Sequence, residues 1–206
     1  MYGAVGGIRA AFFSIIAQVI CDSLSRGLWA NCKAITSSLE TMSSEIYNKL
    51  ARTAQYFVMA TSPRLPGSNV PDPERFLACL AADFQMSWGH SFFVSTKPPL
   101  QGTVDGEGFC QHQGGMAKKL ETWQIEPTST CVDVEKHTAV VRADFSMKVR
   151  SAEAVINDIV FWISMDESGE KVTQAIEFVD PVASAEIAER MKMSTTVEDS
   201  TSTSES

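Results

Sequence analysis

The sequence predicts an α+β domain in which helices pack on one face of a curved antiparallel sheet and enclose a pocket. Helix-type periodicity dominates the first half of the domain, whereas strand-type alternation runs almost without interruption from Trp123 to Val179. The turns between these later strands are short, and short turns join antiparallel neighbours. Helices first and a meander of strands last are typical of the α+β class.

The helices are expected early in the domain. Residues 44–60 begin with a serine N-cap and carry apolar residues at helical spacing, and Asp72-Pro73 supplies a cap and first turn for a second, short helix that ends by Asp83. A strand is expected from Phe84 to Gly89. A third helix is expected over about 105–121, although Gly108, Gly114 and Gly115 within it each cost about 1 kcal/mol relative to Ala.

Four strands and a closing helix complete the domain. The strands are expected over residues 123–134, 138–149, 154–165 and 171–179. Asp180-Pro181 repeats the Asp-then-Pro cap and predicts the closing helix. Both faces of strand 154–165 are mostly apolar, so we expect one face to be covered by helices and the other by a ligand, a partner subunit or both.

Charge and cysteine content exclude several classes of function. The chain has a formal net charge of -8 and no basic cluster, which argues against nucleic-acid binding and against association with an anionic membrane. Five cysteines without CxxC spacing indicate neither a disulfide framework nor a zinc site, and no histidine pair has metal spacing. We therefore expect a cytoplasmic protein without a metal or a cofactor.

The two ends of the chain differ in composition from its centre. The apolar run at residues 10–20 is too short to span a bilayer, and residues 1–43 could be a targeting segment, an added helix or sequence absent from the mature protein. We favour the third interpretation, because Met42 directly precedes the helix start. The functional domain is then residues 44–193, and the polar stretch 194–206 is expected to be disordered.

Two positions in the last strands are candidates for chemistry. Glu177 lies on a strand face with Thr173 and Ala175, where burial would raise its pKa and suit it to acid/base work, although an ion pair or simple exposure is the alternative. Asn157-Asp158 interrupts a buried strand, and only one of the two can face a given pocket. Asp158 could orient a substrate or hydrogen-bond the backbone at a sheet bend.

Histidines and aromatic residues give weaker signals. His90 could shuttle protons or lie on the surface, whereas His112 and His137 read as surface residues of a helix and a turn. Trp88, Phe161 and Trp162 belong to an aromatic set that is large enough to line an apolar cavity, although any hydrophobic core uses the same residues.

The last part of the domain resembles a known family. The stretch Asn157–Trp162, the turn Glu167–Val172 and the ending Glu177–Asp180 resemble SnoaL-like proteins of the NTF2-like superfamily, above all the small tailoring proteins of fungal polyketide, meroterpenoid and indole-alkaloid biosynthesis. The resemblance extends over residues 44–192. It implies a cone-shaped α+β barrel, dimeric through its sheet, with a deep pocket between the sheet and the helices.

The resemblance also implies roles for individual residues. Glu177 is then the acid/base candidate, with Asp158 and His90 as assisting groups. The residues expected to contact a substrate are Asn157, Gln85, Ser87, Trp88, Trp162 and Phe161. The pair of Asp and His that bacterial polyketide cyclases carry on their strands is not identifiable here.

Two classes of function follow from these observations. The first is a cofactor-independent isomerase or cyclase that acts by acid/base catalysis on a secondary-metabolite intermediate, with dehydration or hydrolysis as related reactions. The second is a non-catalytic module that binds a small molecule or dimerises. In both cases the expected partners are a small molecule and a second copy of the chain, without nucleic acid and without stable membrane insertion.

Overall fold

The computed structural model describes residues 44–63 and 69–202, with residues 195–202 described by their backbone alone. The expectations for residues 1–43 and 203–206 lie outside this range. A helix covers residues 44–60. The elements that follow are α2 (Pro73–Leu77), β1 (Leu80–Trp88), α3 (Ser91–Ser95), η1 (Pro98–Leu100), β2 (Thr103–Val104), α4 (Gly106–Ala117), β3 (Leu120–Asp133), β4 (Thr138–Val149), β5 (Val155–Met165), β6 (Val172–Phe178) and α5 (Pro181–Ser202).

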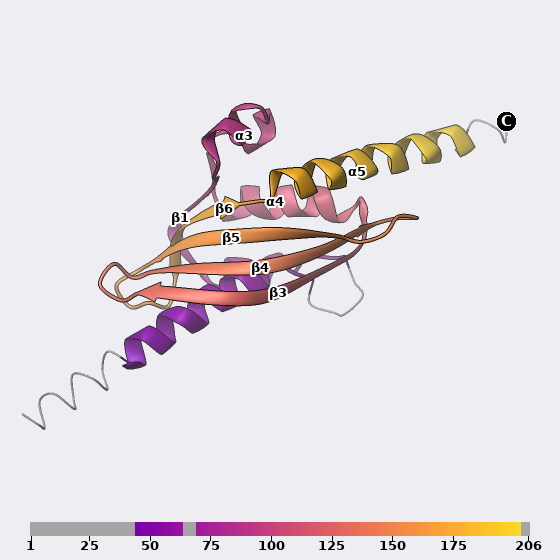
Figure 1. Cartoon of the computed structure of the whole chain (residues 1–206). Coiled ribbons are helices and arrows are strands. Elements are labelled where there is room, and N and C mark those ends of the chain that lie inside the picture. The colour runs from indigo at the N-terminus through magenta and orange to yellow at the C-terminus, as the bar shows by residue number, and fades with distance from the viewer. Residues whose placement is uncertain (1–43, 64–68, 203–206) are drawn as a thin grey trace, which may run out of the picture. The chain divides into compact units, whose positions relative to one another are not determined.

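The strands form one six-stranded sheet in the order β2-β1-β6-β5-β4-β3. Strands β3 to β6 are an antiparallel meander, as the short turns predict. Strand β1, however, pairs in parallel with β6, the last strand of the chain. Helices α4 and α5 pack against this curved sheet (Figure 1), so the predicted α+β class is confirmed.

Three aspartates begin three of the helices. The side chain of Asp72 accepts a hydrogen bond from the backbone N–H of Arg75 at the start of α2, and Asp105 accepts one from Gly108 at the start of α4. Asp180 accepts from the N–H of Val182 at 2.8 Å, which confirms it as the cap of α5. A capping side chain contributes about 1 kcal/mol to helix stability, because it satisfies a backbone donor that has no partner within the helix.

Aromatic rings from distant segments form the centre of the core. Phe57, from the helix at residues 44–60, is fully buried and lies 5.3 Å from the ring of Phe76 and 5.9 Å from the rings of Phe84 and Phe161. Aromatic pairs at such separations add about 0.5–1.5 kcal/mol beyond the area that they bury. This cluster joins the first helix, α2, β1 and β5 into one body.

Several boundaries differ from the expectation; α4, for example, ends at Ala117 rather than near residue 121. Helix α2 ends at Leu77 and β1 already begins at Leu80, because Leu80 pairs with Val172 and the N–H of Val172 donates to the carbonyl of Cys79. Helix α5 continues through Ser202, past Ser194, where we expected an unstructured tail.

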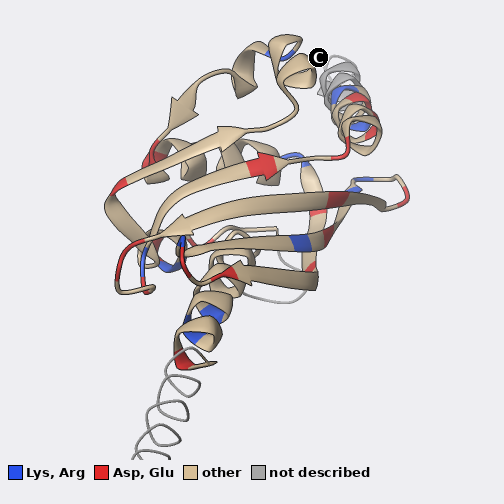
Figure 2. Ribbon diagram, turned by 60° about the vertical axis from the view of Figure 1, so that its left-hand side comes forward, with Lys and Arg blue, Asp and Glu red and all other residues tan. Residues whose placement is uncertain are grey.

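The two faces of β5 are not equally covered. Its inner face is buried, with Ile159, Phe161 and Ile163 each at most 1% exposed. On the outer face Ile156 is 62% exposed and Trp162 is 49% exposed. Among the described residues, therefore, the chain covers the inner face of β5 only. Acidic and basic residues are interspersed along the sheet and the helices rather than separated onto opposite sides (Figure 2).

Candidate active site

A pocket of about 160 Å³ lies between the inner face of the sheet and the helices. Residues Ser184, Ile187, Ala188 and Met191 follow the i, i+3, i+4, i+7 spacing of one helix face, so α5 presents a continuous stripe to the pocket. The other lining residues are Trp88, Phe93, Leu100, His112, Met116, Met147, Asn157, Ile159, Glu177 and Val179.

Glu177 is the acidic residue of this lining. It stands on β6 beside Trp88 of β1, its partner in the parallel register, and its Oε2 accepts a hydrogen bond from Trp88 Nε1 at 3.1 Å. Burial raises the pKa of Glu177 from 4.5 to about 7, and the hydrogen bond from Trp88, which favours the carboxylate, lowers it only in part. A carboxyl group with this pKa can both accept and donate a proton near neutral pH.

His112 also lines the pocket, which corrects the expectation that it lies on the surface. It is on α4 one turn before Met116, and both side chains contribute to the lining. The imidazole ring lies 5.1 Å from the ring of Trp88 and stacks on Phe109 at 6.3 Å. Burial lowers the pKa of His112, so the ring is neutral at pH 7 and can serve either as a hydrogen-bond donor or as an acceptor.

Asn157 is buried and joins the pocket to the start of α5. Its Oδ1 accepts a hydrogen bond from the N–H of Asp180, and its Nδ2 donates to Ser184 Oγ at 3.0 Å. The hydroxyl of Ser184 therefore acts as an acceptor toward Asn157 and keeps its own proton to donate. Asn157 thus positions a hydroxyl donor in the pocket wall.

Asp158 does not reach the pocket. It points to the outer face of the sheet, where its carboxylate forms a two-pronged ion pair with Arg142, with Nε at 2.9 Å from Oδ1. The guanidinium group lowers the pKa of Asp158 and keeps it ionised. Trp162 lies on the same outer face, so the expected roles of Asp158 as an assisting acid and of Trp162 as a substrate contact are both wrong for this pocket.

The remaining candidates also lie outside the lining. Gln85 is exposed, and Ser87, two residues further along β1, lies on the same face of the strand. Trp88 faces the other way and is the β1 residue that lines the pocket. His90 is exposed and its ring packs edge-on against Phe178 at 5.3 Å. Phe161 is on the inner face but is buried in the aromatic core, so it supports the pocket without lining it.

The lining favours a neutral and mostly hydrocarbon ligand. Ten of the lining residues are apolar or aromatic, and the polar groups are Glu177, His112, Asn157 and Ser184. No Lys or Arg is among the described residues of this lining, so an anionic ligand would be buried beside Glu177 without a counter-charge. The polar groups can hold one or two oxygen atoms of such a ligand.

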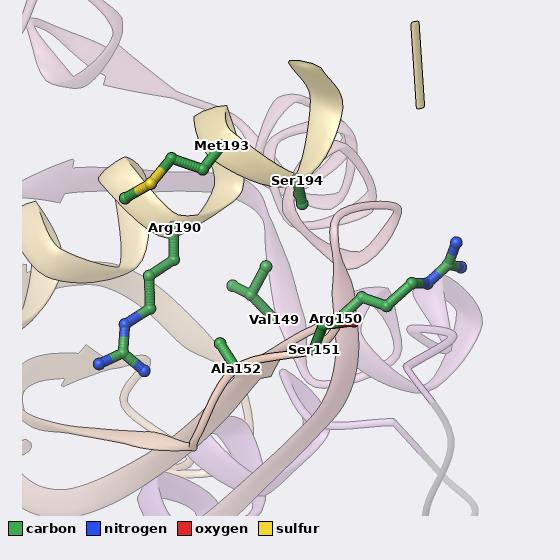
Figure 3. Close-up of a pocket in the computed structure, with 7 residues that line it drawn as sticks. All are labelled: Val149, Arg150, Ser151, Ala152, Arg190, Met193 and Ser194. Carbon is green, nitrogen blue, oxygen red and sulfur yellow. The ribbon is translucent and has the colours of Figure 1, made fainter. Parts of the chain in front are cut away.

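A second cavity, of about 400 Å³, lies between the turn that joins β4 to β5 and the middle of α5. Figure 3 shows Val149, Ala152 and Met193 around it, while the guanidinium groups of Arg150 and Arg190 extend away from its centre. Its lining contains neither a carboxylate nor a histidine. This cavity therefore lacks the groups that proton transfer requires.

Neither a metal site nor a membrane-spanning helix is found in the part of the chain that the structure describes. No group of three His, Cys, Asp or Glu side chains converges as a metal site among residues 44–63 and 69–202. Within the same ranges, the helices are too short or too polar to cross a bilayer.

Solved structures with a similar fold come from fungal and bacterial proteins. A pinacolase, BvnE from Penicillium brevicompactum, superposes with a TM-score of 0.59 at 10% identity, over 73% of this chain and 99% of that one. PrhC from Penicillium brasilianum gives 0.60 at 15% identity, over 73% and 92%. A SnoaL-like polyketide cyclase from Jannaschia gives 0.50 at 13% identity, over 67% and 90%.

This chain has a SnoaL-like fold. No protein-family model matches the sequence, and no curated protein is similar to it in sequence. The resemblance inferred from the last strands is thus confirmed at the level of fold. In this SnoaL-like fold the pocket lies on the inner side of the sheet, where Glu177, Asn157 and Trp88 were expected and His112 was not.

Proposed function

We propose that this protein is a cofactor-independent isomerase or cyclase that acts by proton transfer on a neutral, largely hydrocarbon intermediate of secondary metabolism. The observation that carries the proposal is the carboxyl group of Glu177, which lies in an apolar pocket and has a pKa of about 7. The pinacolase and the polyketide cyclase among the similar structures support an enzyme that acts on small molecules.

Each polar group of the pocket has a role in this proposal. Glu177 exchanges a proton with the reacting carbon or oxygen, and the hydrogen bond from Trp88 holds its carboxylate in place. The hydroxyl of Ser184, oriented by Asn157, donates a hydrogen bond to a carbonyl or hydroxyl oxygen of the substrate. Neutral His112, on α4 beside the ring of Trp88, supplies a second site for a proton.

The test uses the natural substrate, found as the metabolite that accumulates when the gene is deleted. Purified wild-type protein is expected to convert this metabolite, and Glu177→Gln to lower kcat/KM by about 10²–10⁴-fold, the usual contribution of a positioned acid or base. Asp158→Asn is the matched control, because that carboxylate lies on the outer face and is expected to leave turnover unchanged. Unchanged turnover in Glu177→Gln would falsify the proposal.

The predominantly apolar lining also favours a second candidate, a module that binds a small molecule without converting it. In that case the wild-type protein binds the accumulated metabolite but leaves it intact, and Glu177→Gln binds it equally well. Calorimetric titration together with analysis of the recovered metabolite separates the two functions.

The proposal includes a homodimer, because the outer face of the sheet carries an exposed row of apolar side chains. Val140, Trp162 and Ile176 are register partners on β4, β5 and β6, so they form an apolar row across three adjacent strands. Trp162 keeps 49% of its surface exposed. Exposed rows of large apolar residues on a sheet are characteristic of protein interfaces.

A further inference from the structure

The pocket has a roof formed by the segment between β1 and β2, residues 91–101. This segment carries α3 and η1, and Figure 1 shows α3 standing off from the sheet. Two of its side chains, Phe93 and Leu100, line the pocket that contains Glu177. None of the residues in α3 or η1 is fully buried, and Phe92 is 86% exposed.

The hydrogen bonds of this roof stay inside it. The N–H of Leu100 donates to the carbonyl of Lys97, and the N–H of Lys97 donates to the carbonyl of Val94. The side-chain amide of Gln101 donates to the carbonyls of Val94 and Ser95, which ties the end of η1 to α3. Among the described residues, no hydrogen bond joins residues 91–101 to the sheet, to α4 or to α5, so the segment can move without breaking one.

Both ends of the roof have left-handed backbone conformations. His90, directly before α3, has φ 60° and ψ 77°, and Gly102, directly after the segment, has φ 85°. A Cβ at Gly102 would meet no atom within 4 Å, so backbone conformation rather than packing explains the glycine. Two such residues at the ends of a self-contained segment are suited to act as hinges.

The pocket is small in the described conformation. About 160 Å³ is less than the 300–1,000 Å³ that small-molecule sites commonly have. We propose that residues 91–101 lift as one unit about His90 and Gly102, and that Phe93 and Leu100 set the largest ligand that the closed pocket can hold. This inference rests on the proposed function in one respect, namely that the pocket with Glu177 is the substrate site.

Three ketones of increasing size test the inference: cyclohexanone with one ring, 2-decalone with two fused rings and progesterone with four. Dissociation constants are measured by calorimetry for wild type, Phe93→Ala, Leu100→Ala and Phe92→Ala. Both roof variants are expected to bind progesterone about tenfold more tightly than wild type and cyclohexanone about tenfold more weakly, because the truncated side chains leave more room and fewer contacts. Phe92→Ala, the adjacent exposed residue, should match wild type for all three ketones.

NMR relaxation dispersion tests the concerted movement, because it reports motion that breaks no hydrogen bond. The backbone amides of residues 92–97, 100 and 101 are expected to share one exchange rate between the two positions, and saturating 2-decalone should suppress this exchange for all of them together. Separate rates, or exchange that 2-decalone leaves unchanged, would overturn the hinge assignment. Identical ketone preferences in all variants, or no binding of any ketone, would overturn the size role of Phe93 and Leu100.

Glu177→Gln, measured alongside, separates the two proposals. Its ketone preferences should equal those of wild type, because size selection requires no proton transfer. If Glu177→Gln loses turnover but Phe93→Ala keeps the ketone preferences of wild type, the proposed role of residues 91–101 is wrong and the proposed function stands. If Phe93→Ala changes the ketone preferences but Glu177→Gln keeps full turnover, the proposed function is wrong and the role of residues 91–101 stands.

Discussion

At the scale of single residues, two opposing effects determine the pKa of Glu177. The apolar pocket removes water from the carboxylate and favours its neutral form, whereas the N–H of Trp88 favours the charged form. Burial is the stronger effect, so the pKa stays near 7. Trp88 is therefore expected to tune the pH at which Glu177 can act.

Trp88→Phe tests this tuning. Removal of the Nε1 donor leaves burial unopposed, so the pKa of Glu177 should rise above its present value of about 7. The inflection of kcat/KM against pH that Glu177 produces is expected to move to higher pH, whether the group acts as acid or base. Trp162→Phe, the same change on the outer face, should leave the inflection in place. An unmoved inflection in Trp88→Phe would show that the indole does not tune the carboxyl group.

The same raised pKa makes stability depend on pH. The unfolded chain releases the proton of Glu177 near pH 4.5, whereas the folded chain keeps it until about pH 7, so the free energy of unfolding falls between these values as pH rises. The loss is at most about 3.5 kcal/mol, since the pKa rises from 4.5 to about 7 and one pKa unit corresponds to about 1.4 kcal/mol.

Glu177→Gln should abolish this dependence, because an amide does not titrate. Urea unfolding at several pH values is therefore expected to show the variant gaining stability relative to wild type from about pH 5 to pH 8. Glu135→Gln, at an exposed turn, is the control and should follow wild type. A constant difference between Glu177→Gln and wild type across this range would contradict the raised pKa.

Regular strand alternation predicts which face of the sheet a residue lies on. Strand alternation and the resemblance together single out Glu177, but they cannot decide between the neighbours Asn157 and Asp158, which point to opposite faces. The ion pair with Arg142 holds Asp158 outside. His112 could have been found from its spacing to Phe109 and Met116, which places all three on one side of α4.

At the scale of elements, the turn after β1 determines how closely two strands approach. The N–H of Gly89 donates to the carbonyl of Glu177 at 2.7 Å, and a Cβ at Gly89 would lie 2.0 Å from Cε1 of Phe178. No side chain fits at Gly89 without displacing that ring. The glycine thus permits β6 to carry Glu177 directly beside Trp88.

Gly89→Ala is therefore expected to lower the free energy of unfolding by about 1–3 kcal/mol, the usual cost of overpacking. Gly114→Ala is the matched control, since its Cβ would meet nothing within 4 Å and Ala favours the helical conformation of α4 by about 1 kcal/mol. Thermal unfolding of both variants provides the measurement. Equal stability of Gly89→Ala and wild type would contradict the close contact with Phe178.

The sequence predicts elements best where local signals bound them. The expected strand 138–149 matches β4 at both ends, and the Asp-Pro caps mark the starts of α2 and α5. The sequence pattern places the end of α2 too late, at Asp83, because residues from Leu80 onward belong to β1, where Leu80 pairs with Val172. That pairing depends on a strand almost a hundred residues away, so no local pattern reveals it.

At the scale of the whole molecule, the exposed outer face is expected to be covered by a second copy. Trp162→Glu places a charge in the apolar row and should shift the protein to a monomer in sedimentation velocity. Val182→Glu, which changes an exposed apolar residue of α5 outside this row, should leave the oligomeric state unchanged. A wild-type protein that remains monomeric at high concentration would contradict the dimer.

The parallel pairing of β1 with β6 has a consequence for the order in which the chain folds. The hydrogen bond from Trp88 to Glu177 spans 89 residues, so it can form only after the last strand has left the ribosome. Contacts of such long sequence separation slow folding, because a large loop must close before they add stability. The groups that would carry the chemistry are thus assembled in one of the final steps of folding, and an incompletely synthesised chain cannot contain the site.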